Sequence, residues 1–203
     1  MAATHLELLV EEPSMEAFLR GLLPRLLPPD RSFEIHAFQG KGDLLRKLDS
    51  RLRGYAQWLP QDWRILVVVD RDDDDCRMLK ARLDRITNEC GLRTDRAHAN
   101  WKLVNRIAIE ELEAWYFGDW DAVRACYPNV SASIPRKQAY RDPDAISGGT
   151  WEAFERTLQR YGYFKTGLPK VEVARTLATH LSPEANRSAS FRAFVRAIEN
   201  AVR

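Results

Sequence analysis

An uninterrupted run of branched apolar residues near the middle of the chain constrains the fold more than any other feature. Residues 65–69 read Ile-Leu-Val-Val-Val, and Asp70 follows them directly. A strand without alternating polar residues is typical of a parallel sheet that helices cover on both faces. The sequence therefore predicts an α/β protein with an acidic residue at the end of a buried central strand.

Helical patterns alternate with this strand and with three others. The other predicted strands cover residues 5–11, 32–38 and 103–109. After the first three strands, apolar residues recur at helical spacing within residues 15–26, 44–55 and 78–86. Strands that alternate with helices predict parallel pairing through right-handed crossovers. We expect a central, mainly parallel four-stranded sheet flanked by helices.

The chain changes character after about residue 128. Pro128, Pro135, Pro143 and the pair Gly148-Gly149 interrupt a loop-rich stretch. Helical patterns then recur near residues 150–161, 169–180 and 189–202. We expect a metal-binding α/β domain in residues 1–127 and a helical C-terminal extension in residues 128–203 that packs on it.

Composition narrows the class of protein. Of 203 residues, 45% are hydrophobic and 30% are charged, which is typical of a globular protein. No apolar run approaches the roughly 20 residues needed to cross a bilayer, and the first residues do not resemble a secretory signal. We therefore expect a cytoplasmic protein without a membrane partner, for which homo-oligomerisation stays possible.

Cysteine, histidine and charge patterns limit the chemistry. The three cysteines are too few and too widely spaced for a disulfide framework, and the four histidines lack zinc-ligand spacing. The formal net charge is only +2, but many Lys and Arg lie in residues 136–203. This distribution permits a phosphate-bearing partner.

Acidic residues follow three of the four predicted strands. Glu11 follows the first strand, Asp70 and Asp72 follow the third, and Glu111 and Glu113 follow the fourth. The carboxyl ends of parallel strands share one edge, where open α/β sheets bind ligands. Carboxylates without His or Cys suit Mg²⁺ or Mn²⁺, which usually also takes water and phosphate oxygens as ligands. The pattern predicts a divalent cation site for a phosphate-bearing substrate.

A purely structural explanation also exists for some of these acids. The run in residues 72–75 is typical of a solvated turn that caps the next helix. Glu111 and Glu113 begin a helix, where the helix dipole favours acids. Asp70 is harder to explain in this way, because it directly continues a buried strand.

The segments Leu8-Leu9-Val10-Glu11 and Asp70-Arg71-Asp72, with the alternating strands and helices between them, resemble a Toprim domain. Toprim domains carry out metal-dependent phosphodiester chemistry in topoisomerases, primases and OLD-family nucleases. More narrowly, residues 11–19, 69–76 and 111–115 resemble a bacterial Toprim-like family of unassigned function, often encoded beside an AAA or ABC-type ATPase.

The resemblance implies roles for individual residues. Glu11 would be a metal ligand or a general acid/base, Asp70 and Asp72 would bind Mg²⁺ or Mn²⁺, and Glu113 would be a further catalytic acid. The chain also departs from the pattern, because Glu12 occupies the position where Toprim domains usually have glycine.

A second departure and two basic segments complete the candidate site. OLD-type sequences often carry a second acid four residues after the first glutamate, and this chain has Met15 at that position. The departure puts a second metal site in doubt. Lys41, between Gly40 and Gly42, and Lys165, in the aromatic-rich residues 161–167, are candidate phosphate-binding residues. Lys170 extends the segment that contains Lys165. An ordinary turn is the favoured explanation of residues 40–42, and a turn in the core explains residues 161–167 equally well.

The leading hypothesis is a Mg²⁺-dependent nuclease that hydrolyses phosphodiester bonds in DNA or RNA. The resemblance adds a partner ATPase and a role in bacterial defence or genome maintenance. The alternative is a non-catalytic metal-binding module that regulates the ATPase. A nucleotide-sugar glycosyltransferase with an Asp-x-Asp motif would leave Glu11 without a role. A receiver-type phosphoacceptor domain would need acids after the first strand and a lysine after a fifth strand, and the sequence does not show this combination.

Overall fold

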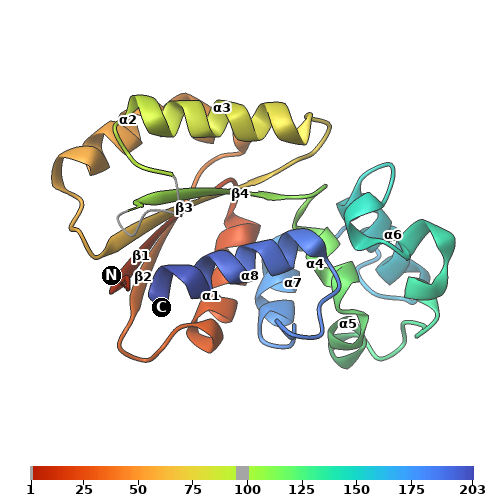
Figure 1. The fold of residues 1–203 in the computed structure, drawn as a ribbon. Coiled ribbons are helices and arrows are strands. Elements are labelled where there is room, and N and C mark those ends of the chain that lie inside the picture. Colours follow the sequence, from red (N-terminus) through yellow and green to blue (C-terminus); the bar gives the residue numbers. More distant parts are fainter. Residues whose placement is uncertain (1, 95–100) are drawn as a thin grey trace.

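A parallel sheet of four strands forms the centre of the protein (Figure 1), and the computed structural model describes residues 2–94 and 101–203. The strands are β1 (His5–Val10), β2 (Ser32–Ala37), β3 (Trp63–Asp70) and β4 (Leu103–Ala108). Their order across the sheet is β2-β1-β3-β4, and every neighbouring pair is parallel. The predicted α/β fold with a parallel four-stranded sheet is confirmed.

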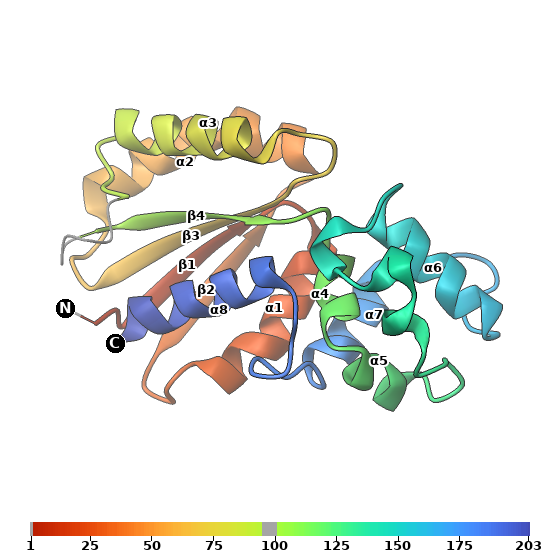
Figure 2. The ribbon, with the colours of Figure 1, turned by 45° about the vertical axis from the view of Figure 1, so that its right-hand side comes forward.

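Helices cover both faces of this sheet, as Figures 1 and 2 show. One face carries α2 (Lys41–Trp58) and α3 (Cys76–Glu89), and the other carries α1 (Pro13–Leu26) and α8 (Ala189–Val202). Leu66 and Val68 of β3 belong to the hydrophobic cluster on the α1 side. Ile65, Val67 and Val69 belong to the cluster on the α2 side. The unbroken apolar run of β3 is thus explained by burial on both faces.

The remaining helices are α4 (Leu112–Gly118), α5 (Trp120–Cys126), α6 (Thr150–Arg160) and α7 (Lys170–Ala178). Figures 1 and 2 place α4, α5 and α6 beyond the carboxyl ends of the strands. The loop-rich stretch contains three short 3-10 turns, Ile134–Arg136, Gln138–Tyr140 and Pro143–Ala145. In residues 2–94 and 101–203, no helix is both long and apolar enough to span a bilayer.

Helix α7 packs closely along α1. A Cβ atom placed on Gly21 of α1 would lie only 2.7 Å from the Cβ of Ala178 in α7, so glycine permits this approach. Side chains of α4 to α8 share one hydrophobic cluster with β1 and α1. The common core therefore extends across residue 128, and it positions α7 beside the carboxyl edge of the sheet.

Candidate metal centre

Asp70 ends β3 with a buried carboxyl group. The residue is 6% exposed, and its Oδ1 atom has no hydrogen-bond partner among the described residues. Burial raises the pKa of Asp70 well above its ordinary value, and repulsion from four neighbouring carboxylates raises it further. These four are Glu11, Glu113, Glu12 and Asp72. The structure therefore brings the acids of three strand ends to one place.

Glu11 is tied directly to Asp70. Its Oε2 atom accepts a hydrogen bond of 3.2 Å from the backbone N–H of Asp70. Burial raises the pKa of Glu11, the hydrogen bond from Asp70 lowers it, and repulsion from Asp72 raises it again, with a net increase. The backbone thus holds the Glu11 carboxylate beside the end of β3.

Glu12 departs from the Toprim pattern without backbone strain. It precedes α1 with φ −145° and ψ 164°, an extended conformation that any residue adopts. Its carboxylate accepts a hydrogen bond from the Ser14 hydroxyl group and contributes to the repulsion at Asp70. A glycine is therefore not required here, and Glu12 adds an acid to the site.

Asp72 and Lys41 form an ion pair at the exposed side of the site. The Lys41 Nζ atom lies 2.7 Å from Asp72 Oδ2 and 2.8 Å from Asp74 Oδ2. Burial lowers the pKa of Lys41, but hydrogen bonds to these carboxylates raise it more. Gly40 precedes α2 with φ 88°, and Lys41 is the first helical residue. Lys41 thus reaches the acidic edge from the start of α2.

Glu113 lies in the first turn of α4 and is 2% exposed. Burial is the main cause that raises its pKa to about 7, while the positive charge of Lys170 opposes the increase. Glu111 has a different role, because its Oε2 atom accepts hydrogen bonds of 2.9 Å from the Thr150 hydroxyl group and the Trp151 backbone. Glu111 therefore joins α4 to α6, whereas Glu113 faces the acids.

Lys170 and Tyr116 are two further candidate residues. The sequence indicated Lys170 only as part of a possible phosphate-binding segment with Lys165, and it did not indicate Tyr116. Burial lowers the pKa of Lys170, but Glu113, Glu12, Glu111 and Asp70 together raise it above its ordinary value. Its Nζ atom lies 4.7 Å from the centroid of the Trp151 ring. Lys170 is thus a positive charge that α7 directs toward the acids.

Tyr116 of α4 places a hydroxyl group near the same acids. The residue is buried, and its hydroxyl oxygen has no hydrogen-bond partner among the described residues. Burial raises the pKa of Tyr116 well above its ordinary value, followed by the charges of Glu113 and Asp70. Lys165, in contrast, is exposed between α6 and α7, and no described contact joins it to the acids. Its proposed role in substrate binding stays a prediction.

The chemistry of the site fits a hard divalent cation. No three His, Cys, Asp or Glu side chains within residues 2–94 and 101–203 form a ready metal-binding group. The unpartnered Oδ1 of Asp70, however, is an oxygen donor that a cation would satisfy, and the surrounding carboxylates would lose their mutual repulsion. Glu11, Asp70 and Asp72 are the predicted ligands, and they interact electrostatically at one edge of the sheet.

Comparison with protein families decides where the chain belongs. A single family model matches residues 10–199, which is most of the chain. The chain belongs to the family described as "Domain of unknown function (DUF4276)". No curated protein and no solved structure matches it. The matched range includes the acids of the site and also Lys170, so it covers strands β2 to β4 and the helices from α1 to α7.

Proposed function

We propose that this protein is a Mg²⁺- or Mn²⁺-dependent phosphodiesterase that hydrolyses nucleic acid, as the Toprim nucleases it resembles do. The buried carboxyl group of Asp70, whose Oδ1 atom has no hydrogen-bond partner among the described residues, carries this proposal. A carboxyl group in this position is costly to bury unless a partner satisfies it. Its four acidic neighbours make a cation the fitting partner.

The side chains divide into three roles. Asp70, Glu11 and Asp72 would hold the cation, which when bound would polarise a phosphate and lower the pKa of a water molecule. Glu113 would hold or move a proton, because a pKa of about 7 suits general acid/base chemistry near neutral pH. Lys41 and Lys170 would bind phosphate oxygens with their ammonium groups.

Metal binding and cleavage are tested separately. Calorimetric titration with Mn²⁺ and thermal unfolding with and without Mg²⁺ are measured for the wild type, Asp70→Asn and Asp121→Asn. Asp121 is the matched control, because its side chain is 95% exposed and lies on α5. The wild type and the control should gain thermal stability from the metal, whereas Asp70→Asn should not.

Cleavage of plasmid DNA, single-stranded DNA and tRNA is then assayed in Mg²⁺ or Mn²⁺. Glu11→Gln and Asp70→Asn should lose activity that the wild type shows. Cleavage by Asp70→Asn at the wild-type rate would refute the proposal.

The second candidate is a metal-binding module that regulates a partner ATPase without catalysis. The ion pair between Asp72 and Lys41 favours it, because this contact occupies one predicted ligand with a protein cation. We propose the ATPase partner and the cytoplasmic location only from the resemblance and the sequence. Cleavage that appears when the neighbouring ATPase is added would support a regulated nuclease, and its absence would favour the module.

A further inference from the structure

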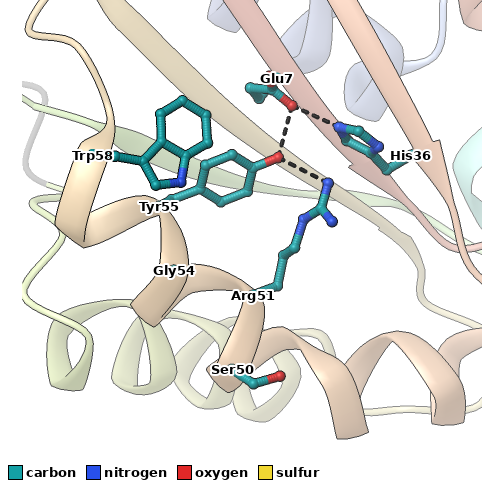
Figure 3. A pocket seen from close by; sticks show the side chains of 7 residues that line it. All are labelled: Glu7, His36, Ser50, Arg51, Gly54, Tyr55 and Trp58. Atoms are coloured by element: carbon teal, nitrogen blue, oxygen red, sulfur yellow. Dashed lines mark hydrogen bonds and ion pairs between the residues drawn. The ribbon is translucent and has the colours of Figure 1, made fainter.

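A groove lies between α2 and the edge strand β2, separate from the acids. Its first part has a volume of about 430 Å³ and is lined by Glu7, His36, Ser50, Arg51, Gly54, Tyr55 and Trp58. Figure 3 shows side chains of α2 facing Glu7 and His36 of the sheet. An adjoining cavity of about 640 Å³ shares His36, Ser50 and Arg51 and continues to residues 37–39, Asp43 and Lys47. We call these two cavities together the α2 groove.

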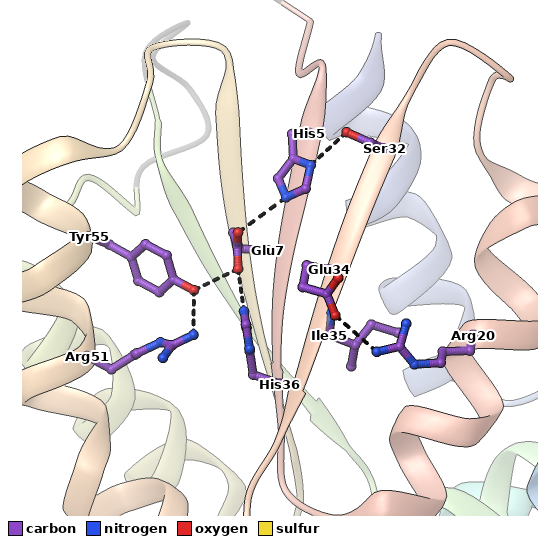
Figure 4. A network of polar contacts seen from close by, with 9 residues as sticks. All are labelled: His5, Glu7, Arg20, Ser32, Glu34, Ile35, His36, Arg51 and Tyr55. Carbon is purple, nitrogen blue, oxygen red and sulfur yellow. Dashed lines mark hydrogen bonds and ion pairs between the residues drawn. The ribbon is translucent and has the colours of Figure 1, made fainter.

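A buried carboxylate organises the base of the α2 groove. Glu7 Oε2 lies 2.7 Å from His36 Nε2 and accepts a hydrogen bond of 2.7 Å from the Tyr55 hydroxyl group. Its Oε1 atom lies 3.2 Å from His5 Nε2 (Figure 4). These contacts fix the rings of His36 and Tyr55, so the groove has a preformed polar wall.

Arg51 is positioned by this wall. Its guanidinium group donates a hydrogen bond of 3.2 Å to the Tyr55 hydroxyl group and lies 5.2 Å from the centroid of the Tyr55 ring. Arg51 is exposed, and its described contacts are both with Tyr55, so its other N–H groups can bind a ligand. Lys47 lines the same groove with a side chain that is largely exposed, although it pairs with Asp43. Two cations therefore border the groove.

Trp58 adds an exposed aromatic surface at the end of α2. It is 56% exposed, yet its ring is held by Tyr55 at 5.3 Å and by Trp63 at 5.8 Å between ring centroids. A positioned indole ring next to a guanidinium group is a combination that binds nucleotides, because the base stacks on the ring and the phosphate binds the cation.

We propose that the α2 groove binds single-stranded nucleic acid, with a base stacked on Trp58 and the adjacent phosphates on Arg51 and Lys47. A strand fits better than a free nucleotide, because the groove continues toward the acids. It reaches Gln39, and the next residue, Gly40, donates its backbone N–H to the backbone oxygen of Glu11. This inference rests on the proposed nuclease function and names single strands as its substrate class.

Binding is measured by fluorescence anisotropy of a labelled oligothymidylate in EDTA, so that neither metal nor cleavage contributes. Trp58→Ala should weaken binding on the order of 5- to 150-fold, which is the usual effect of losing one stacked base. Trp58→Phe should retain most of the affinity, because it keeps an aromatic ring. Arg51→Ala should also weaken binding and reduce the slope of affinity against salt by about 0.7.

The matched control is Arg53→Ala on the same helix. Arg53 pairs with Asp49 and does not line the groove, so its removal should leave affinity close to that of the wild type. Thermal unfolding of each variant shows whether it is folded. Weakening by Trp58→Ala together with retention by Trp58→Phe supports stacking. Equal affinity of the wild type, Trp58→Ala and Arg51→Ala would overturn the proposal.

Two further arms identify the ligand and separate this inference from the nuclease proposal. Adenosine monophosphate and duplex DNA are titrated as competitors, and binding of the monophosphate without the strand would overturn the assignment to single strands. Asp70→Asn should bind the strand like the wild type in EDTA. If the wild type binds the strand but does not cleave it, even with the neighbouring ATPase added, the nuclease proposal alone is refuted. If cleavage is unchanged in Trp58→Ala and Arg51→Ala, the groove proposal alone is refuted.

Discussion

Replacing Glu113 by Gln should stabilise the folded protein at alkaline pH. Glu113 is 2% exposed, and burial raises its pKa from 4.5 to about 7. The folded protein therefore holds this proton more tightly than the unfolded chain does. Its contribution to stability is complete below about pH 4.5 and is lost as the pH rises through about 7. The difference between the two pKa values corresponds to about 3 kcal/mol of unfolding free energy.

The assay is urea-induced unfolding of the wild type and Glu113→Gln in EDTA. Near pH 5 the two free energies of unfolding should differ by less than about 1 kcal/mol, and near pH 8.5 the variant should be more stable by about 3 kcal/mol. Glutamine keeps the shape of the side chain but carries no charge, so packing changes little. Glu89→Gln is the control for the loss of a glutamate charge, since Glu89 is exposed on α3.

One result would refute the reasoning. Glu113→Gln could change the free energy of unfolding equally near pH 5 and near pH 8.5. The folded protein would then stabilise the Glu113 carboxylate to the same extent as water does. Lys170 would then neutralise Glu113 fully, contrary to the raised pKa of this carboxyl group.

Three other substitutions test neighbouring parts of the structure. Lys170→Met should raise the pKa of Glu113 further, because Lys170 is the main group that lowers it, and carboxyl NMR titration measures the change. Gly118→Ala should lower the free energy of unfolding in urea by about 2 to 4 kcal/mol, because the new Cβ would lie 2.0 Å from Oδ1 of the buried Asn186. Unchanged stability would show that Asn186 can move. Asp144→Ala should lower the free energy of unfolding by about 1.5 to 3 kcal/mol. The Asp144 carboxylate accepts hydrogen bonds from two backbone N–H groups and two serine hydroxyl groups at the start of α8. A smaller loss would mean that water replaces these hydrogen bonds.

The central fold could be predicted because its signals are local in the sequence. The apolar run of residues 65–69 indicates burial on both faces, and β3 is indeed covered by a cluster on each side. The acids at strand ends could be predicted for the same reason, since parallel pairing alone brings Glu11 and Asp70 to one edge. A strand pattern and one topological rule were sufficient for both.

The positions of Lys170 and Tyr116 beside the acids could not be predicted, because tertiary packing determines them. Lys170 begins α7, and this helix reaches the acids by packing along α1, where Gly21 permits close contact with Ala178. Nothing in the sequence around Lys170 indicates that contact. Toprim domains usually have glycine at the position of Glu12. The backbone of Glu12 is extended, which does not require glycine, and the sequence alone does not show this conformation.

Two buried carboxyl groups of the sheet show why Asp70 is the better candidate for a functional site. Glu7 of β1 is as buried as Asp70, but His5, His36 and Tyr55 satisfy its oxygens, so its burial is explained by the structure itself. The Oδ1 atom of Asp70 has no partner in the part of the chain that the structure describes, and the acidic neighbours increase the cost of ionising this carboxyl group. Polar groups buried in this way destabilise a fold. A hydrophobic residue at the end of β3 would destabilise the fold less than Asp70 does. The folded chain by itself therefore does not explain Asp70, whereas a bound cation would explain it.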